Sequence, residues 1–150
     1  MVFYLREREK RDFKTIREGE IWKVNIPKSN YGDHIQFGEK YVVVMSNNLN
    51  NKYSPNISYV VLTSKKQNKS LPTHHTFKAG ELQARELCLD TVVLGESYTS
   101  IDKKYFMNRV GKVTEEQFKA IGNCVAVQSP ILFAIKIDNI NFSSNPFQTA

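Results

Sequence analysis

The fold is decided by residues 52–75, which read KYSPNISYVVLTSKKQNKSLPTHH. Residues 57–62 form an apolar, largely β-branched run after a polar turn, and this pattern predicts a mostly buried strand. The strand leads into a loop of hydroxyls, amides and lysines over residues 63–74. Because such a loop offers several hydrogen-bond donors and positive charges, we expect it to contact an anion.

Strands are also predicted upstream of this stretch. Trp22, Val24 and Ile26 alternate with polar residues and indicate a half-buried strand, whereas residues 41–45 form the continuous apolar run that is typical of a central strand. The polar residues 46–51 predict a turn between this central strand and the next one.

Downstream, shorter strands are predicted at residues 75–78, 89–94 and 109–113. Asp102 is placed to cap a short helical turn over residues 103–106.

One clear helix is predicted near the C-terminus. Residues 114–117 read TEEQ, which is a capping box, and Pro130 is expected to end the helix. The apolar residues between them fall on one stripe: Phe118, Ile121, Cys124 and Val125.

Many short strands and one late helix predict a mainly β domain, a small SH3-like barrel that closes its sheet to hide the edges. At 150 residues a single core is expected. We divide the chain into a charged N-terminal extension, residues 1–16, a barrel domain, residues 17–128, and a C-terminal extension, residues 129–150. The mixed charges of the first 17 residues suit a surface helix with a weak apolar face, but we favour a marginally ordered leader. Residues 131–137 suit a further strand.

The net charge of +6 favours a polyanionic partner. Residues 63–78 carry four lysines and no acid, and residues 102–112 carry four cations against Asp102 alone. Two basic loops of this kind can line one groove for a phosphate backbone. Lysines that only keep solvated loops soluble are the alternative.

Cysteine and histidine usage argues against a metal site. Cys88 and Cys124 are far apart in apolar surroundings, which predicts two buried thiols. His74 and His75 are adjacent, so on an extended strand they point to opposite faces and cannot chelate one ion together. We therefore expect no metal and no cofactor. Without a signal peptide or an apolar run near the ~20 residues of a membrane span, a cytoplasmic protein is expected.

The order of these pieces resembles the toxin subunit of the MazF/PemK (Kid) family of type II toxin-antitoxin systems, whose members are metal-independent endoribonucleases also called mRNA interferases. The resemblance rests on NKYSP at residues 51–55, on a strand that ends in Thr63, on the lysine-rich loop, and on LPTH at residues 71–74. It spans residues 17–128 and continues with GEIW at 19–22, GEKYVVV at 38–44 and TSIDKK at 99–104.

The resemblance implies a catalytic pair formed by Thr63 and Lys40, the latter standing where the family has an arginine. Lysine keeps the charge but loses the planar fork that holds a phosphate through two hydrogen bonds. A lysine that is merely solvated before a strand is the alternative. A second departure lies at residues 96–102, where Thr99 takes the place of another family arginine and Asp102 is retained.

We expect further residues to contact RNA: Ser64, Lys65, Lys66, Lys69, His74, Thr99, Ser100, Asp102 and Lys103. The resemblance implies a homodimeric toxin that cuts single-stranded RNA, leaves a 2′,3′-cyclic phosphate and a 5′-hydroxyl, and is inhibited by a small acidic antitoxin. Because one family arginine is a lysine here and another is absent, the alternative is a catalytically weakened or inactive MazF-like module that binds nucleic acid or a protein partner.

Overall fold

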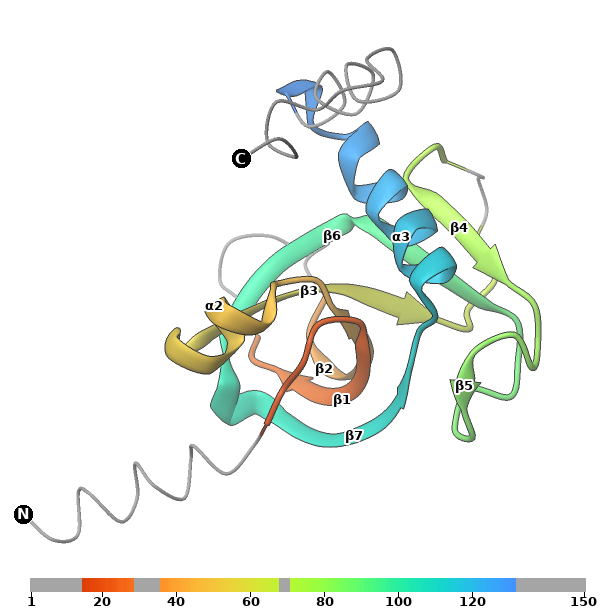
Figure 1. Ribbon diagram of the computed structural model, residues 1–150. Coiled ribbons are helices and arrows are strands. Elements are labelled where there is room, and N and C mark those ends of the chain that lie inside the picture. Colours follow the sequence, from red (N-terminus) through yellow and green to blue (C-terminus); the bar gives the residue numbers. More distant parts are fainter. Residues whose placement is uncertain (1–14, 29–35, 68–70, 132–150) are drawn as a thin grey trace, which may run out of the picture.

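The computed structural model describes residues 15–28, 36–67 and 71–131 (Figure 1). Seven strands form one antiparallel sheet in the order β4-β6-β3-β2-β1-β7-β5. The strands are β1 (Glu20–Ile26), β2 (Gly38–Val44), β3 (Asn56–Thr63), β4 (His74–Phe77), β5 (Gln83–Ala84), β6 (Thr91–Asp102) and β7 (Phe106–Lys112). The helices are α2 (Asn48–Tyr53), the short 3₁₀ turn η1 (Lys103–Tyr105) and α3 (Glu115–Val127).

β3 is the predicted buried strand, and it packs against a core on each of its faces. The first core takes Ile57, Tyr59 and Val61 from β3, and the second core takes Val60 and Leu62. Trp22, Val24 and Ile26 of β1 also enter the first core, so the predicted alternation of β1 is confirmed. The other members of the first core are Ile16, Val42, Val44, Leu94 and Phe106, and those of the second are Ile21, Val43, Phe77, Leu82, Leu87, Val93, Val113, Ile121 and Val125.

The mainly β fold with one long helix is confirmed, but the sheet does not close into a barrel. Its edge strands are β4 and β5, and no ladder joins them among the described residues. The segment between β4 and β6 crosses this gap, as Figure 1 shows, and its short strand β5 pairs with β7. Leu82 and Leu87 from the crossing segment enter the second core. The edges are therefore protected by being short and by this segment, instead of by closure.

β6 is longer than the strand predicted at residues 89–94, because the Gly-Glu-Ser sequence at 95–97 forms an irregularity within the strand and does not end it. The register between β3 and β6 shifts between Tyr59 and Val61. At this shift the Ser97 hydroxyl accepts the Val61 N–H at 2.9 Å and donates to the Leu94 carbonyl at 2.6 Å. The side chain thus supplies a hydrogen bond where the ladder is interrupted.

Residues 46–51, predicted as a turn, instead lead into and begin the helix α2. Asn47 caps this helix by accepting the N–H of Asn50 at 2.8 Å. The buried Asn51 donates to the Ser46 carbonyl at 2.8 Å, and the Ser46 hydroxyl accepts the Ser58 N–H of β3 at 3.1 Å. Side-chain hydrogen bonds thus hold α2 against the start of β3.

α3 begins as predicted, with the Thr114 and Gln117 capping box, and its apolar stripe packs on the sheet beside β4 and β6 (Figure 1). It ends at Val127, ahead of Pro130. The prediction of two buried thiols is wrong for Cys88, which is exposed because its neighbour Leu87 occupies the core position, whereas Cys124 is buried.

The predicted N-terminal helix and, beyond Ile131, the predicted C-terminal strand lie outside the described residues. Across the described ranges, no helix combines the length and the apolar character needed to cross a membrane.

Gly95 in β6 allows α3 to approach the sheet, and its substitution tests this contact. A Cβ at this position would lie 2.6 Å from the Cys124 carbonyl oxygen and 2.7 Å from that of Thr73. Because backbone must move to accept a methyl group there, we expect Gly95→Ala to lower the free energy of unfolding by about 1–3 kcal/mol. A Cβ added at Gly122 in α3 would have no atom within 4 Å. The control Gly122→Ala should therefore raise the free energy of unfolding by roughly 0.5–1 kcal/mol. Urea unfolding measures both, and a Gly95→Ala protein as stable as wild type would contradict the close approach.

Candidate active site

The predicted catalytic pair lies where β3 ends beside the start of β2. The pairing of these antiparallel strands runs from Val44 opposite Tyr59 to Tyr41 opposite Leu62, and Lys40 and Thr63 are the next residues at that end. Side chains alternate along a strand, so both residues lie on the face that carries the first core. The structure therefore places Lys40 and Thr63 at the same end of neighbouring strands and on one face of the sheet.

The Thr63 hydroxyl is held by the loop that follows it. Its oxygen accepts the Lys65 N–H at 3.2 Å, and the Gln67 side-chain amide donates to the Lys65 carbonyl at 2.9 Å. The hydroxyl uses its oxygen as an acceptor in this contact and keeps its proton, so Thr63 can still donate a hydrogen bond to a phosphate oxygen.

Positive charge and an aromatic ring surround this end of the sheet. Lys65 and Lys66 are exposed directly after Thr63, as is Ser64, whereas Lys69 lies outside the described residues. Phe37, which the sequence reasoning missed, enters β2 at the same end and is 52% exposed. The Nζ of Lys28 lies 5.7 Å from its ring centroid. An exposed ring next to cations is a platform on which an RNA base can stack.

His74 in β4 lies on the same face of the sheet as Thr63. His74 pairs with Leu94 of β6, and Leu94 pairs with Val61 of β3. Val61 is two residues before Thr63 on the same strand, so His74 lies close to Thr63 along this face. Its Nε2 lies 2.7 Å from Oε1 of Glu96. The His74 side chain is only 8% exposed, and its buried Nδ1 has no hydrogen-bond partner among the described residues. The short contact with Glu96 therefore fixes the imidazole in place.

Sequence reasoning missed this role of Glu96, because its partner stands far away in the chain and no local pattern connects them. Burial alone would raise the pKa of Glu96, but hydrogen bonds from His74, from its own backbone and from Thr73 lower it below the usual carboxyl value. Glu96 therefore keeps its charge beside His74.

The remaining predicted site residues lie toward the opposite end of β3. Asp102 pairs with Asn56 and Ser100 with Ser58, and Thr99 pairs with Tyr59 one residue closer to the middle of β3. The eight residues of β3, at a rise of about 3.3 Å each, separate its ends by roughly 23 Å. The structure thus places Lys103 and the basic segment that follows it away from the lysines after Thr63, not side by side with them.

At this second end the polar side chains make structural contacts. Asp102 caps η1 by accepting the Lys104 N–H at 2.9 Å, which confirms its predicted capping role. The hydroxyls of Ser58 and Ser100 lie 2.8 Å apart across the ladder. In the part of the chain that the structure describes, no three His, Cys, Asp or Glu side chains gather as metal ligands.

Comparison with known proteins identifies a family that matches this chain and solved structures that share its fold. A family model described as PemK-like, MazF-like toxin of type II toxin-antitoxin system matches residues 17–128, the range over which the sequence resembles that family. The chain is also similar to the endoribonuclease MazF of Staphylococcus saprophyticus. The two are 22% identical over 112 residues, which are 75% of this chain and 89% of that protein.

Solved structures share the fold at low sequence identity. MazF from Deinococcus radiodurans matches with a TM-score of 0.61 at 16% identity, over 76% of this chain and 96% of that chain. An endoribonuclease in complex with its cognate antitoxin from a Mycobacterial species matches with a TM-score of 0.55 at 19% identity, over 75% and 92% of the two chains.

The Glu96 and His74 contact predicts a pH dependence of stability. The pKa of Glu96 is lowered in the folded protein, so its charge contributes stability above the unfolded carboxyl pKa of about 4.3, and this contribution is lost as pH falls through the folded pKa. We expect the unfolding midpoint of Glu96→Gln to decline less steeply below pH ~5 than that of wild type. His74→Gln removes the partner and should flatten the same slope. Thermal unfolding at a series of pH values measures all three proteins, and parallel curves would contradict the assignment.

Proposed function

Because the chain belongs to the family of PemK-like and MazF-like toxins of type II toxin-antitoxin systems, we propose that it is a metal-independent endoribonuclease that cuts single-stranded RNA at the Thr63 end of β3. The observation that carries this proposal is that Lys40 and Thr63 lie at the same end of the neighbouring strands β2 and β3 and on one face of the sheet. Similarity to an endoribonuclease MazF supports the same activity. We place the protein in the cytoplasm, where its RNA substrate is.

RNA cleavage without a metal requires a positioned phosphate and stabilisation of the charge that develops on it. The ribose O2′ attacks the phosphorus and passes its proton to water, the bond from phosphorus to O5′ breaks, and O5′ takes a proton from water. The products are a 2′,3′-cyclic phosphate and a 5′-hydroxyl. In this mechanism the Thr63 hydroxyl donates a hydrogen bond to a non-bridging oxygen, while its own oxygen accepts the Lys65 N–H. Lys40 supplies positive charge beside it.

The groups around this pair hold the RNA strand. Lys65 and Lys66 offer charge to neighbouring phosphates, and the exposed ring of Phe37 offers a stacking surface. His74 is a positioning residue, because Glu96 holds its ring on the face that carries Thr63. The exposed loop after Thr63 therefore binds substrate, while β2 and β3 carry the chemistry.

Substitutions at Lys40 and Thr63 test the proposed catalysis. Lys40→Ala and Thr63→Ala are each expected to slow cleavage of a long unstructured RNA in chelator by about 10²–10³-fold, by analogy with the loss of one donor from an oxyanion site. RNA binding should weaken only slightly, because one phosphate contact among several is lost. Lys40→Arg should keep or raise activity, because it returns the bidentate fork.

Gel analysis of fragments at fixed salt, with the exposed Lys119→Ala in α3 as control, measures these rates. Wild-type binding without fragments would support the non-catalytic module. Full cleavage by Lys40→Ala would remove this residue from the mechanism even if the family's activity were present.

We further propose a homodimer that a small acidic antitoxin inhibits. The net charge of +6 supports an acidic partner, and solved relatives include MazE-MazF of Deinococcus radiodurans and an endoribonuclease in complex with its cognate antitoxin. The antitoxin segment competes with RNA for the lysines after Thr63.

Sedimentation at micromolar concentration is expected to give twice the 17.3 kDa chain mass. Adding the acidic protein encoded next to the gene should raise this mass and stop RNA cleavage. A monomer, or cleavage unaffected by that protein, would count against the respective part of the proposal.

A further inference from the structure

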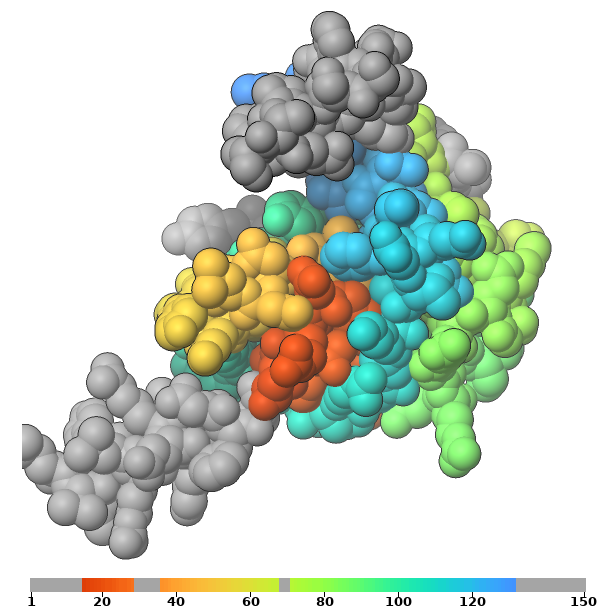
Figure 2. Space-filling view, in the orientation of Figure 1, coloured from red at the N-terminus to blue at the C-terminus, as the bar shows by residue number. Residues whose placement is uncertain are grey.

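A polar hollow lies at the other end of β3, away from Lys40 and Thr63. Its volume is about 630 Å³, a size that holds a nucleotide-sized ligand. It is lined by residues from the start of the described chain, from α2 and from η1: Thr15, Ile16, Arg17, Asn48, Asn51, Lys52, Tyr53 and Lys103. Figure 2 shows the start of the described chain, in red, directly against α2, in yellow.

The charge of this hollow has one sign. Arg17, Lys52 and Lys103 line it, and none of its lining residues is an acid. Lys103 Nζ donates to the Lys52 carbonyl at 3.4 Å, which holds the Lys103 ammonium against the backbone of α2. The neighbouring Asp102 carboxylate accepts the Lys104 N–H at the start of η1. Three cations around one hollow favour an anionic ligand.

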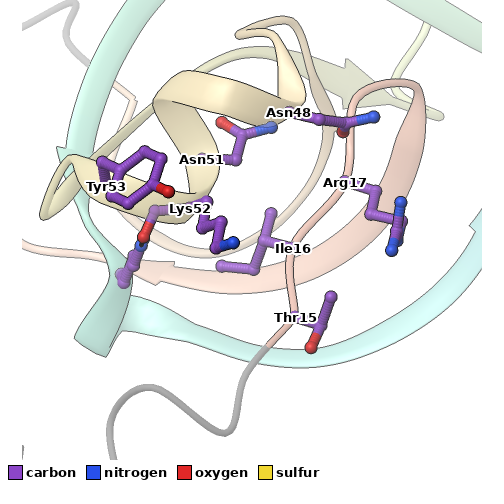
Figure 3. A pocket seen from close by; sticks show the side chains of 8 residues that line it. Thr15, Ile16, Arg17, Asn48, Asn51, Lys52 and Tyr53 are labelled. Carbon is purple, nitrogen blue, oxygen red and sulfur yellow. Dashed lines mark hydrogen bonds between the residues drawn. The ribbon is translucent and has the colours of Figure 1, made fainter.

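The walls of the hollow are held in place by contacts with the folded chain. Ile16 belongs to the first core, and Figure 3 shows its side chain between those of Lys52 and Arg17. The Arg17 N–H donates at 2.6 Å to the buried Glu20 carboxylate. Asn51 is buried and bonded to the Ser46 carbonyl. The site is therefore formed before a ligand arrives.

An aromatic ring accompanies the cations. Tyr53 is 72% exposed, and the Nζ of Lys52 lies 5.3 Å from its ring centroid. The amide of Asn48 also lines the hollow and can bond a base edge. Proteins hold single-stranded nucleic acid with this combination, cations for the phosphates and a ring for the bases. An acidic peptide would use the cations but has no use for the ring.

We propose that this hollow is a second RNA subsite, which binds a nucleotide of the same single strand that is cut at the Thr63 end. The inference rests on the proposed function. The two sites are roughly 23 Å apart along β3, which at about 3.4 Å per stacked nucleotide corresponds to about seven nucleotides. A four-nucleotide RNA is too short to occupy both sites at once, whereas a sixteen-nucleotide RNA is long enough to do so.

The test compares two double variants that remove the same charge. Lys52→Ala/Lys103→Ala changes the hollow, and Arg85→Ala/Lys119→Ala changes two exposed cations in the turn after β5 and in α3. Fluorescent RNAs of four and sixteen nucleotides, methylated at every O2′ so that they cannot be cut, are titrated at several salt concentrations. The slope of log affinity against log salt for the longer RNA should fall by about 1.4 in the first variant, since each lost contact to a single strand removes ~0.7. The shorter RNA and the control variant should show no such change.

Tyr53→Ala tests the stacking contact separately. It is expected to weaken binding of the longer RNA roughly tenfold without changing the salt slope. Leu49→Ala, an equally exposed residue on the same helix, is its control. Circular dichroism of each variant confirms that it is folded.

An unchanged slope for Lys52→Ala/Lys103→Ala would overturn the subsite. The subsite would also be overturned if Lys52→Ala/Lys103→Ala lost affinity for a poly-glutamate peptide but kept its affinity for RNA. It would likewise be overturned if AMP bound the wild-type protein as tightly as the longer RNA does. Cleavage of unmodified RNA by wild type is measured in parallel. If wild type cleaves RNA and the double variant binds the longer RNA as wild type does, only the subsite is refuted. If wild type binds RNA through the hollow but does not cleave it, only the proposed catalysis is refuted.

Discussion

Because β3 is buried on both faces, the rest of the chain has to cover it twice, and most other features of the structure follow from that requirement. The first core is formed by β1, β2, β3, β6 and Phe106 of β7, and the second is covered by α3 and by the segment between β4 and β6. With both faces taken by apolar side chains, the two ends of β3 are where it meets solvent. Thr63 stands at one end, and α2 with η1 stands at the other. The two candidate binding sites are therefore consequences of how the central strand is buried.

Features with a local cause could be predicted from the sequence, and features that depend on distant residues could not. β3 and the Thr114 capping box follow from patterns within a few residues, and both are present. The Gly-Glu-Ser sequence at 95–97 has the composition of a turn, but pairing with β3 and β4 keeps it in one strand, with Ser97 bonding across the irregularity. The residues expected to form a turn before β3 become helical because Asn51 bonds to Ser46 and Ser46 in turn bonds to Ser58.

The same distinction applies to the candidate site. Thr63 and Lys40 could be found because each belongs to a strand that the sequence identifies, and the pairing of β2 with β3 then places both at the same end of the sheet. The contact between His74 and Glu96 has no sequence signal, since it forms only when β4 pairs with β6. The hollow at Lys103 is likewise invisible in sequence, because it joins the segment before β1 to α2 and η1.

Because position 40 is a lysine, the geometry of the proposed site depends on how the backbones of β2 and β3 pair. An arginine offers both charge and a rigid pair of donors, whereas a lysine offers a point charge on a flexible stem. In this chain Lys40 lies within a ladder, paired with Val24 of β1 on one side and next in register to Thr63 on the other. Thr63 contributes a hydroxyl whose oxygen accepts the Lys65 N–H. In the proposed mechanism Lys40 supplies charge and Thr63 supplies a hydrogen bond, and the pairing of β2 with β3 places the two residues at one end of the sheet.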